Sequence, residues 1–348
     1  MFETFELRDK EQGYKSIVVL LYSLVADIFG LHLLTTEQWT KTVGGIILSV
    51  HGRLLASYLV HEFAHSSVFI NPRTNHAFGI ISLWLAGCPY CDFTRIRDLH
   101  LSHHKDRCDT VEFDYRTFLH HLPKPLLWFI LLGEYLMIPI VETIMHLRTA
   151  IFPLIAGSHR MISISRRRNA LVGSAVCIAL YAWLYSTHAL LPHLFAGALV
   201  LQILAFHDCF QHTYEAVFVD KVDYVPGPGP RTAQFEYENT FTNPISIQYP
   251  YLNTLISLNF GYHNAHHKKP MVAWYQLPQL HAKYFSDSVQ ILPFSHLFRT
   301  WFRHRIRRVL EFDYGTVHPV SSSLGQRLDN IDRTIDFVGS LGVSFLTV

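Results

Sequence analysis

The sequence predicts an all-α integral membrane fold with about four transmembrane helices in two hairpins, interfacial helices and a cytosolic cap. Three observations lead to this fold class: 49% of the 348 residues are hydrophobic, only 16% are charged, and the apolar residues gather in long runs. Soluble proteins carry about a quarter charged residues, so this chain has too few charges to cover a soluble globule. The low charged fraction and the net charge of +2 also argue against disorder and against nucleic-acid binding.

Each crossing of a bilayer needs about 20 mainly apolar residues. Four segments come close to this requirement and pair into two hairpins, residues 17–34 with 43–60 and residues 170–191 with 192–206. Asp27 and Arg53 lie at similar distances from the turn of the first hairpin. Because an unpaired charge inside a bilayer is costly, we expect an intramembrane ion pair; the alternative is that one or both side chains reach the interface.

Basic residues indicate the orientation of these hairpins. One group lies between the hairpins and another precedes the second hairpin, and the positive-inside rule places both in the cytosol. The groups are Arg95, Arg97, Lys105 and Arg107, and Arg160, Arg166, Arg167 and Arg168. Residues 126–141 are apolar but include Glu134 and Pro139. Because the basic flanks place both ends of this stretch in the cytosol, we expect an interfacial or re-entrant helix there and not a full crossing. No cleavable signal peptide is expected, because several acidic residues precede the first apolar run.

The part of the chain beyond the last apolar run, residues 207–348, is predicted to be largely cytosolic. Within it, residues 297–310 show the pattern of an amphipathic helix, with an aromatic stripe beside five arginines. Such a helix suits the anionic inner leaflet, and packing against the body of the protein is the alternative. We therefore expect a membrane domain over residues 1–290, followed by a C-terminal cytosolic helix and tail over residues 291–348.

Histidine accounts for 23 of the 348 residues and gathers in four clusters beside the apolar runs. On a helix, residues three and four apart share a face, so three of the four clusters each present several imidazoles in one direction. The clusters are His61 and His65; His100, His103 and His104; His207 and His212; and His263, His266 and His267. Neutral imidazole suits iron, zinc, copper and nickel, and this many donors exceeds the needs of one ion. Two metal ions are implied, and iron fits the donor count better than zinc.

Other interpretations of these residues are weaker. The segment from His61 to His65 is literally H-E-x-x-H, the zinc-protease pattern in which Glu62 acts as general base, but it leaves three clusters unexplained. A non-enzymatic metal transporter would place its histidines within the apolar runs. Cys88 and Cys91 have the C-x-x-C spacing of a redox pair but lack a surrounding βαβ pattern, so ordinary packing is expected.

On four stretches, HEFAHSSVF, HLSHHKDRCD, HDCFQHTYE and LNFGYHNAHHKKP, the chain resembles the membrane fatty acid desaturase and hydroxylase family, and the resemblance covers about residues 15–285. It implies a mushroom-like helical membrane fold, a histidine-bound centre of two iron ions on the cytosolic side, and O2 as co-substrate. It also implies electrons from cytochrome b5 or from ferredoxin with its reductase; no haem-binding or ferredoxin-like segment occurs in the chain itself. The implied iron ligands are His61, His65, His100, His103, His104, His212, His263, His266 and His267.

Several further residues are expected near the iron ions. Asp208 lies where acyl-CoA desaturases have an asparagine that holds an iron-bound water, so its carboxylate is a candidate ligand or bridge. His207 is expected to lie near the centre or at the surface and not to bind iron. Metal-bound imidazoles generally donate their other N–H to an oxygen atom, and Glu62, Asn264, Glu215 and Glu238 are candidates for this role; ordinary surface or capping roles are the alternative for the last two.

The resemblance implies an O2-dependent desaturase that introduces a double bond into the aliphatic chain of a fatty acid or acyl lipid. The alternative is a hydroxylase, or a related C–H oxidase, of a lipid, polyketide or terpenoid chain, since both reactions begin with the same hydrogen removal. The aromatic side chains of Tyr181, Trp183 and Tyr185 either line a tunnel for the acyl chain or face lipid. We expect a multi-pass membrane protein of the endoplasmic reticulum if eukaryotic, or of the inner membrane if bacterial.

Overall fold

The computed structural model of the chain describes residues 5–156, 162–219, 231–285, 291–292, 294–317, 334–340 and 345–347. Arg160, one of the basic residues used to predict orientation, lies outside this range. The chain forms two compact units. The first comprises Met1–Leu101, Glu142–Leu204 and Phe345–Val348, and the second comprises Ser102–Val141 and Ala205–Ser344. The second unit combines residues from both sides of position 290, and the domain boundary expected there stays a prediction.

Among the described residues, four helices are long and apolar enough to cross a membrane, as the sequence predicts. They are α1 (Tyr14–Leu34), α2 (Trp39–Ala64), α8 (Ile164–Ser186) and α9 (Leu190–Cys209). The ends of the second hairpin differ from the prediction, because α8 ends at Ser186 and α9 begins before Pro192. His188 has a positive φ of 57° in the short turn that joins them, and this conformation interrupts the helix.

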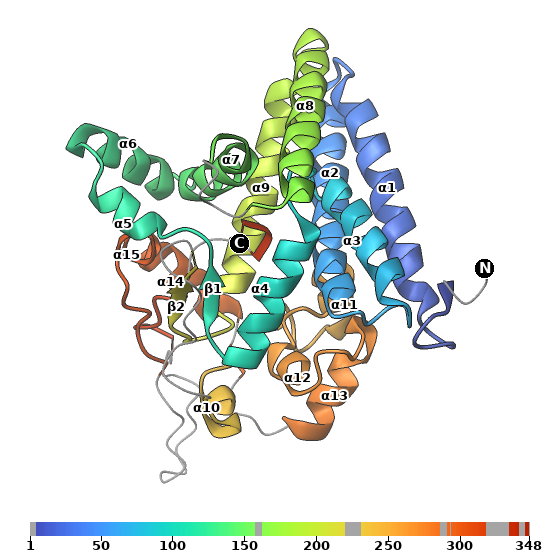
Figure 1. Cartoon of the computed structure of the whole chain (residues 1–348), viewed down its shortest axis with the longest axis vertical. Coiled ribbons are helices and arrows are strands. Elements are labelled where there is room, and N and C mark those ends of the chain that lie inside the picture. The colour runs from blue at the N-terminus through green and yellow to red at the C-terminus, as the bar shows by residue number, and fades with distance from the viewer. Residues whose placement is uncertain are drawn as a thin grey trace. The chain divides into compact units, whose positions relative to one another are not determined.

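The first unit is built around the close packing of α1, α2 and α3 (Pro72–Leu85), which lie side by side in Figure 1. A Cβ atom at Gly30 would lie 2.5 Å from Ser49 Oγ, and one at Gly45 would lie 2.8 Å from the Gly30 carbonyl oxygen. Small residues at these positions let the backbones of α1 and α2 approach, as in other membrane helix pairs.

The predicted intramembrane ion pair is confirmed in the first unit. Arg53 Nε donates to Asp27 Oδ1 at 3.1 Å, and the side chains of Arg53 and Asp27 are 7% and 18% exposed. A second nitrogen of Arg53 lies 3.3 Å from His193 Nδ1, on α9. The observed pairing therefore favours the ion pair over the alternative, in which one or both side chains reach the interface.

The aromatic residues of α8 face outward in the first unit. Tyr181, Trp183 and Tyr185 are 38%, 47% and 74% exposed. On a candidate membrane-spanning helix, exposed aromatic rings are suited to contact with lipid. The structure therefore favours the lipid-facing interpretation of these three residues over an acyl tunnel.

The apolar stretch at residues 126–141 is not one continuous helix. It is divided between α6 (Lys124–Tyr135) and α7 (Ile140–Ile155), with Pro139 in the break between them. Such a pair is either a broken span or a re-entrant loop, so the expectation of an interfacial or re-entrant helix without a full crossing stays a prediction. Glu134 is 1% exposed and forms an ion pair of 2.6 Å with Arg305, both in the second unit.

The second unit contains the two β-strands found among the described residues. Strands β1 (Asp109–Val111) and β2 (Ala216–Phe218) pair in parallel, with Thr110 opposite Val217. The other short elements are α5 (Tyr115–His120), α10 (Ala233–Glu238), α11 (Pro250–Ser257), α12 (His263–Lys268), the 3₁₀ helix η2 (Trp274–Gln276) and α13 (Leu277–Tyr284). Helix α4 (Phe93–Asp106) begins in the first unit and ends in the second, and the 3₁₀ helix η4 (Phe345–Thr347) belongs to the first unit.

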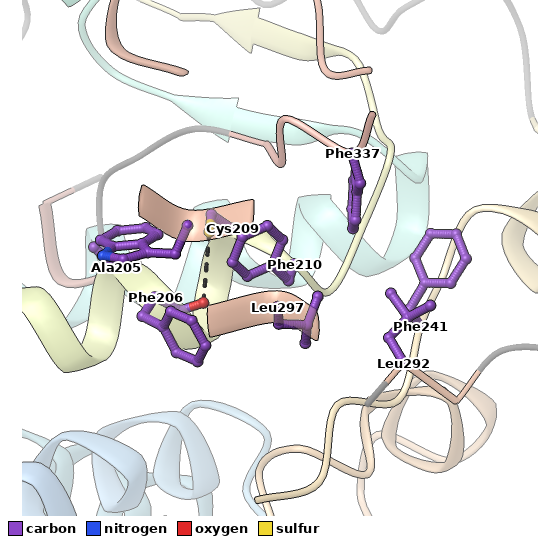
Figure 2. Packing of buried hydrophobic residues seen from close by; sticks show 9 residues of the cluster. Ala205, Phe206, Cys209, Phe210, Phe241, Leu292, Leu297 and Phe337 are labelled. Atoms are coloured by element: carbon purple, nitrogen blue, oxygen red, sulfur yellow. Dashed lines mark hydrogen bonds between the residues drawn. The ribbon is translucent and has the colours of Figure 1, made fainter. Parts of the chain in front are cut away.

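A buried aromatic cluster forms the core of the second unit, and Figure 2 shows its packing. Phe206 in the last turn of α9 and Phe210 just after the helix contribute rings that lie 5.5 Å and 6.3 Å from that of Trp301. Phe337, from a distant part of the chain, lies 5.4 Å from Phe210. Burying several large aromatic side chains in one cluster stabilises the unit through removal of apolar surface from water.

The predicted amphipathic helix at residues 297–310 is divided and partly buried. It consists of α14 (Phe294–Arg303) and α15 (Arg305–Leu310), separated at His304. Phe298 and Phe302 are exposed, but Trp301 is 2% exposed and belongs to the aromatic cluster. One side of this segment therefore packs against the body of the protein, which was the alternative to membrane binding.

The prediction that the arginines form an exposed polar face is wrong for two of them. Arg308 is fully buried, donates to the Val338 carbonyl oxygen at 2.6 Å and lies 4.5 Å above the Trp301 ring. Arg305 is also buried and pairs with Glu134. The two guanidinium groups are accommodated because the fold supplies acceptors and aromatic faces for them.

Candidate metal centre

Three of the predicted ligands lie together in the first unit, and we call them the histidine triad: His61, His65 and His100. His61 and His65 lie at the end of α2, where helix spacing places them on one face, and His100 lies on α4. His65 Nε2 and His100 Nε2 are 2.7 Å apart, and the His61 ring centroid is 4.7 Å from that of His65 and 4.6 Å from that of His100. The three side chains offer ligand atoms within 4.8 Å of one another.

Glu62 lies beside the triad and is itself buried. Its Oε1 atom is 3.6 Å from His61 Nδ1, and its Oε2 atom accepts a hydrogen bond of 2.7 Å from Ser67 Oγ. The carboxylate thus lies near His61 Nδ1, just beyond hydrogen-bonding distance. The role of Glu62 in orienting a metal-bound imidazole stays a prediction.

Four further predicted ligands converge in the second unit, and we call them the four-histidine cluster: His103, His212, His263 and His267. Their Nε2 atoms point toward one another, with distances of 3.0 Å from His103 to His212, 3.3 Å from His103 to His267 and 2.7 Å from His263 to His212. All four ligand atoms lie within 4.8 Å of one another. Four nitrogen donors aimed at one point match the needs of a divalent transition metal.

The outer ring nitrogens of this cluster have oxygen partners. His103 Nδ1 lies 3.0 Å from the Cys108 carbonyl oxygen and 3.3 Å from Asp109 Oδ1. His267 Nδ1 lies 3.1 Å from Glu236 Oε1. An N–H held on Nδ1 by such partners leaves the ring lone pair on Nε2, which is the tautomer that a metal requires.

His212 has the most enclosed ring of the cluster. Burial, and next the neighbouring rings of His103 and His263, lower the pKa of His212 well below its usual value. Its ring is stacked on Tyr214 with 4.1 Å between centroids, and its Nδ1 lies 3.3 Å from Thr240 Oγ1. His212 is therefore neutral near pH 7 and suited to bind a cation.

The remaining histidines of the predicted set are also buried or half-buried in the second unit. His104 Nε2 and His266 Nε2 lie 3.0 Å apart. His207 is 3% exposed and is not a member of the four-histidine cluster. The possibility that His207 is a surface residue is therefore wrong.

Two of the predicted orienting residues have other partners. Glu215 is exposed and forms an ion pair of 2.9 Å with Arg231. Glu238 is exposed and accepts a hydrogen bond of 2.6 Å from Gln234. The alternative of an ordinary surface role describes both glutamates better.

Asn264 and Asp208 have less direct relations to the cluster. Asn264 accepts a hydrogen bond from Thr242 Oγ1 and donates one to the Thr240 carbonyl oxygen, each 2.6 Å long. It thereby joins α12 to the segment that also contacts His212. Asp208 is half-buried and is not among the side chains that form the four-histidine cluster within the described residues. Its role as an iron ligand stays a prediction.

The structure identifies two orienting residues that the sequence did not, Glu236 and Asp109. Glu236 Oε2 also accepts from Arg107 Nε at 3.0 Å, so one carboxylate contacts both a histidine of the cluster and an arginine. Asp109 begins strand β1. In the sequence neither residue stands at a helical spacing from a histidine, and only the fold brings them to the cluster.

Comparison with known proteins agrees with this arrangement. A profile of the fatty acid desaturase family matches residues 37–307, and the chain belongs to this family of oxidoreductases. The chain is also similar to a sphingolipid delta(4)-desaturase from Candida albicans, with 25% identity over 237 residues that cover 64% of this chain. The match spans 56% of the length of that relative. No solved structure matches the chain.

Proposed function

We propose that this protein is an O2-dependent lipid desaturase that introduces a double bond into an aliphatic chain by means of two histidine-bound iron ions. The observation that carries the proposal is the four-histidine cluster, where inward Nε2 atoms are combined with oxygen partners on the outer nitrogens. Family membership supports lipid desaturation as the general activity. Family membership also favours desaturation over the zinc-protease and metal-transporter interpretations. Neither of these two interpretations accounts for four histidine clusters.

The residues present fit two metal ions. The four-histidine cluster would hold one, and the histidine triad would supply ligands to the other. His104 and His266 are assigned as further ligands by their places in the two H-x-x-H-H boxes. Bound iron would supply the oxidising power needed to remove hydrogen from an unactivated methylene group.

The protein's own side chains prepare this chemistry in two ways. Burial keeps imidazoles such as His212 neutral, because a charged ring would be poorly solvated there. Glu236 and Asp109 fix the orientation of His267 and His103, so these rings are ready to bind without rearrangement. In the overall reaction, the saturated substrate gives up two hydrogen atoms and becomes an alkene. These two hydrogens combine with O2, two protons and two electrons to form two water molecules.

The substrate, the membrane and the electron donor follow from the same proposal. The relative from Candida albicans is named for a sphingolipid, which favours a lipid with a long aliphatic chain as the substrate here. We place the active site at the cytosolic face of the endoplasmic reticulum in a eukaryote, or of the inner membrane in a bacterium. Cytochrome b5, or ferredoxin with its reductase, would deliver the electrons from outside the chain.

The test is expression in a host of known lipid composition, followed by mass spectrometry of the lipids. The proposal predicts a product two hydrogens lighter than its precursor. His103→Ala should abolish this product and lower the iron content, whereas His121→Ala, at an exposed histidine outside both clusters, should leave the product unchanged. A product one oxygen heavier would indicate a hydroxylase, and an active His103→Ala variant would contradict the metal assignment.

A further inference from the structure

A second group of metal-binding side chains lies in the first unit, outside the nine predicted iron ligands. We call it the Cys-His group: Cys88, Cys91 and His146. The two cysteines lie in the turn between α3 and α4, and His146 lies on α7. Their ligand atoms are within 4.8 Å of one another, and Cys88 Sγ lies 3.9 Å from His146 Nδ1. The three residues are 4%, 4% and 7% exposed.

The surroundings of His146 suit a metal ligand. Its Nδ1 atom faces Cys88 and lies 2.8 Å from the Tyr90 hydroxyl. On the other side of the ring, Nε2 faces Glu142 Oε1 at 3.7 Å, and Glu142 is 2% exposed. A carboxylate behind one ring nitrogen, with thiols before the other, is the arrangement that directs a histidine toward zinc.

The donor set also fits zinc by charge and number. Two cysteines and one histidine supply three of the four ligands that zinc usually takes, which leaves one position for the Tyr90 hydroxyl or for water. When zinc binds, each thiol loses its proton, and the two thiolates neutralise the charge of the ion. A buried site without net charge avoids the high cost of an isolated ion in an apolar environment.

We propose that Cys88, Cys91 and His146 bind one zinc ion at a site that is separate from the histidine centre. The zinc ion joins the turn after α3 to α7, two elements that are far apart in the sequence. The same turn lies beside η4, where the Cys91 thiol donates to the Leu346 carbonyl oxygen at 3.6 Å; zinc would take the place of this proton. The neighbouring Phe345 ring lies 6.2 Å from His61 and 6.5 Å from His100, which places a residue of η4 against the histidine triad.

Elemental analysis of the full chain, purified in detergent, tests the site. We expect about one zinc ion per chain, lost in Cys88→Ser and in Cys91→Ser. Cys177→Ser is the matched control, because Cys177 is a half-buried free thiol on α8 outside the group. Retention of zinc in both variants at the level of Cys177→Ser would overturn the proposal.

Cobalt gives a second readout that separates this site from the histidine centre. A chain loaded with cobalt should show thiolate-to-cobalt charge-transfer absorption, and the nine histidines of the proposed iron centre cannot produce it. The absorption should persist in Cys177→Ser and disappear in the other two variants. Its absence from the wild-type chain would count against the site.

A measurement without variants covers the case in which the substituted chains do not fold. Titration of the wild-type chain with an organomercurial that reacts with thiols should release one zinc ion, detected with a coloured chelator. Mass spectrometry of protein that was alkylated without prior reduction shows whether Cys88 and Cys91 are linked by a disulfide. If Cys88 and Cys91 form a disulfide in zinc-free chain, the group is a redox pair and the zinc proposal is wrong.

Discussion

Replacing Glu236 with glutamine tests how the four-histidine cluster is held. The Glu236 carboxylate has two partners, His267 Nδ1 at 3.1 Å and Arg107 Nε at 3.0 Å, and its side chain is 19% exposed. Glutamine keeps the shape and one acceptor oxygen but loses the negative charge. We therefore expect His267 to become a weaker and less well-oriented ligand, while the fold is retained.

The magnitude follows from the role of the contact. Removing the outer partner of a metal-bound histidine typically lowers metal affinity about 10-fold to 100-fold. This range corresponds to about 1.4–2.7 kcal/mol of binding free energy. Because glutamine can still accept one hydrogen bond, we expect a value toward the lower end, with product formation reduced in parallel.

The assay is competition for iron(II) between the purified chain and a chelator of known affinity. Glu238→Gln is the matched control, since Glu238 lies on the same short helix but is exposed and contacts Gln234. Only Glu236→Gln should lose affinity. If the two variants bind iron within a factor of two of each other, the role given to Glu236 is refuted.

Three further predictions concern stability and the surroundings of the site. Asp27→Asn leaves the buried Arg53 without its counter-charge and should lower the free energy of unfolding by about 3–5 kcal/mol. The loss is measured as a lower unfolding midpoint in detergent, and adding Arg53→Met should recover much of it. Phe345→Ala removes a ring packed on the histidine triad and should lower iron affinity about twofold to tenfold, since such contacts contribute about 0.5–1.5 kcal/mol; unchanged affinity would contradict this role. Burial lowers the pKa of His281 in the folded chain. As the pH falls below about 6.5, the imidazole therefore takes up a proton in the unfolded chain before it does so in the folded chain, and the free energy of unfolding declines. His281→Phe should reduce this decline, and an identical pH profile of the unfolding midpoint would count against it.

Features that depend on local spacing could be predicted from the sequence. The length of each apolar run identifies the two hairpins, and the fixed rise of a helix places Asp27 and Arg53 at similar depth, where the structure pairs them. Helical spacing likewise indicates that His61 and His65 share one face of α2.

Features that depend on tertiary placement could not be predicted. Glu236 lies on a six-residue helix, and nothing in its sequence neighbourhood connects it to His267. Arg308 has the pattern of a residue on an exposed basic face, yet the aromatic cluster of the second unit encloses it. The Cys-His group combines a turn with a helix more than 50 residues away, so C-x-x-C spacing alone indicated only ordinary packing.

Iron content per chain tests the central claim most directly. We predict about two iron ions in the active wild-type chain and about one when His103 and His267 are both replaced by alanine. Replacement of His61 and His65 should likewise remove about one ion. Active protein that contains no iron, or iron content that is the same in all three chains, would contradict the assignment of these histidines.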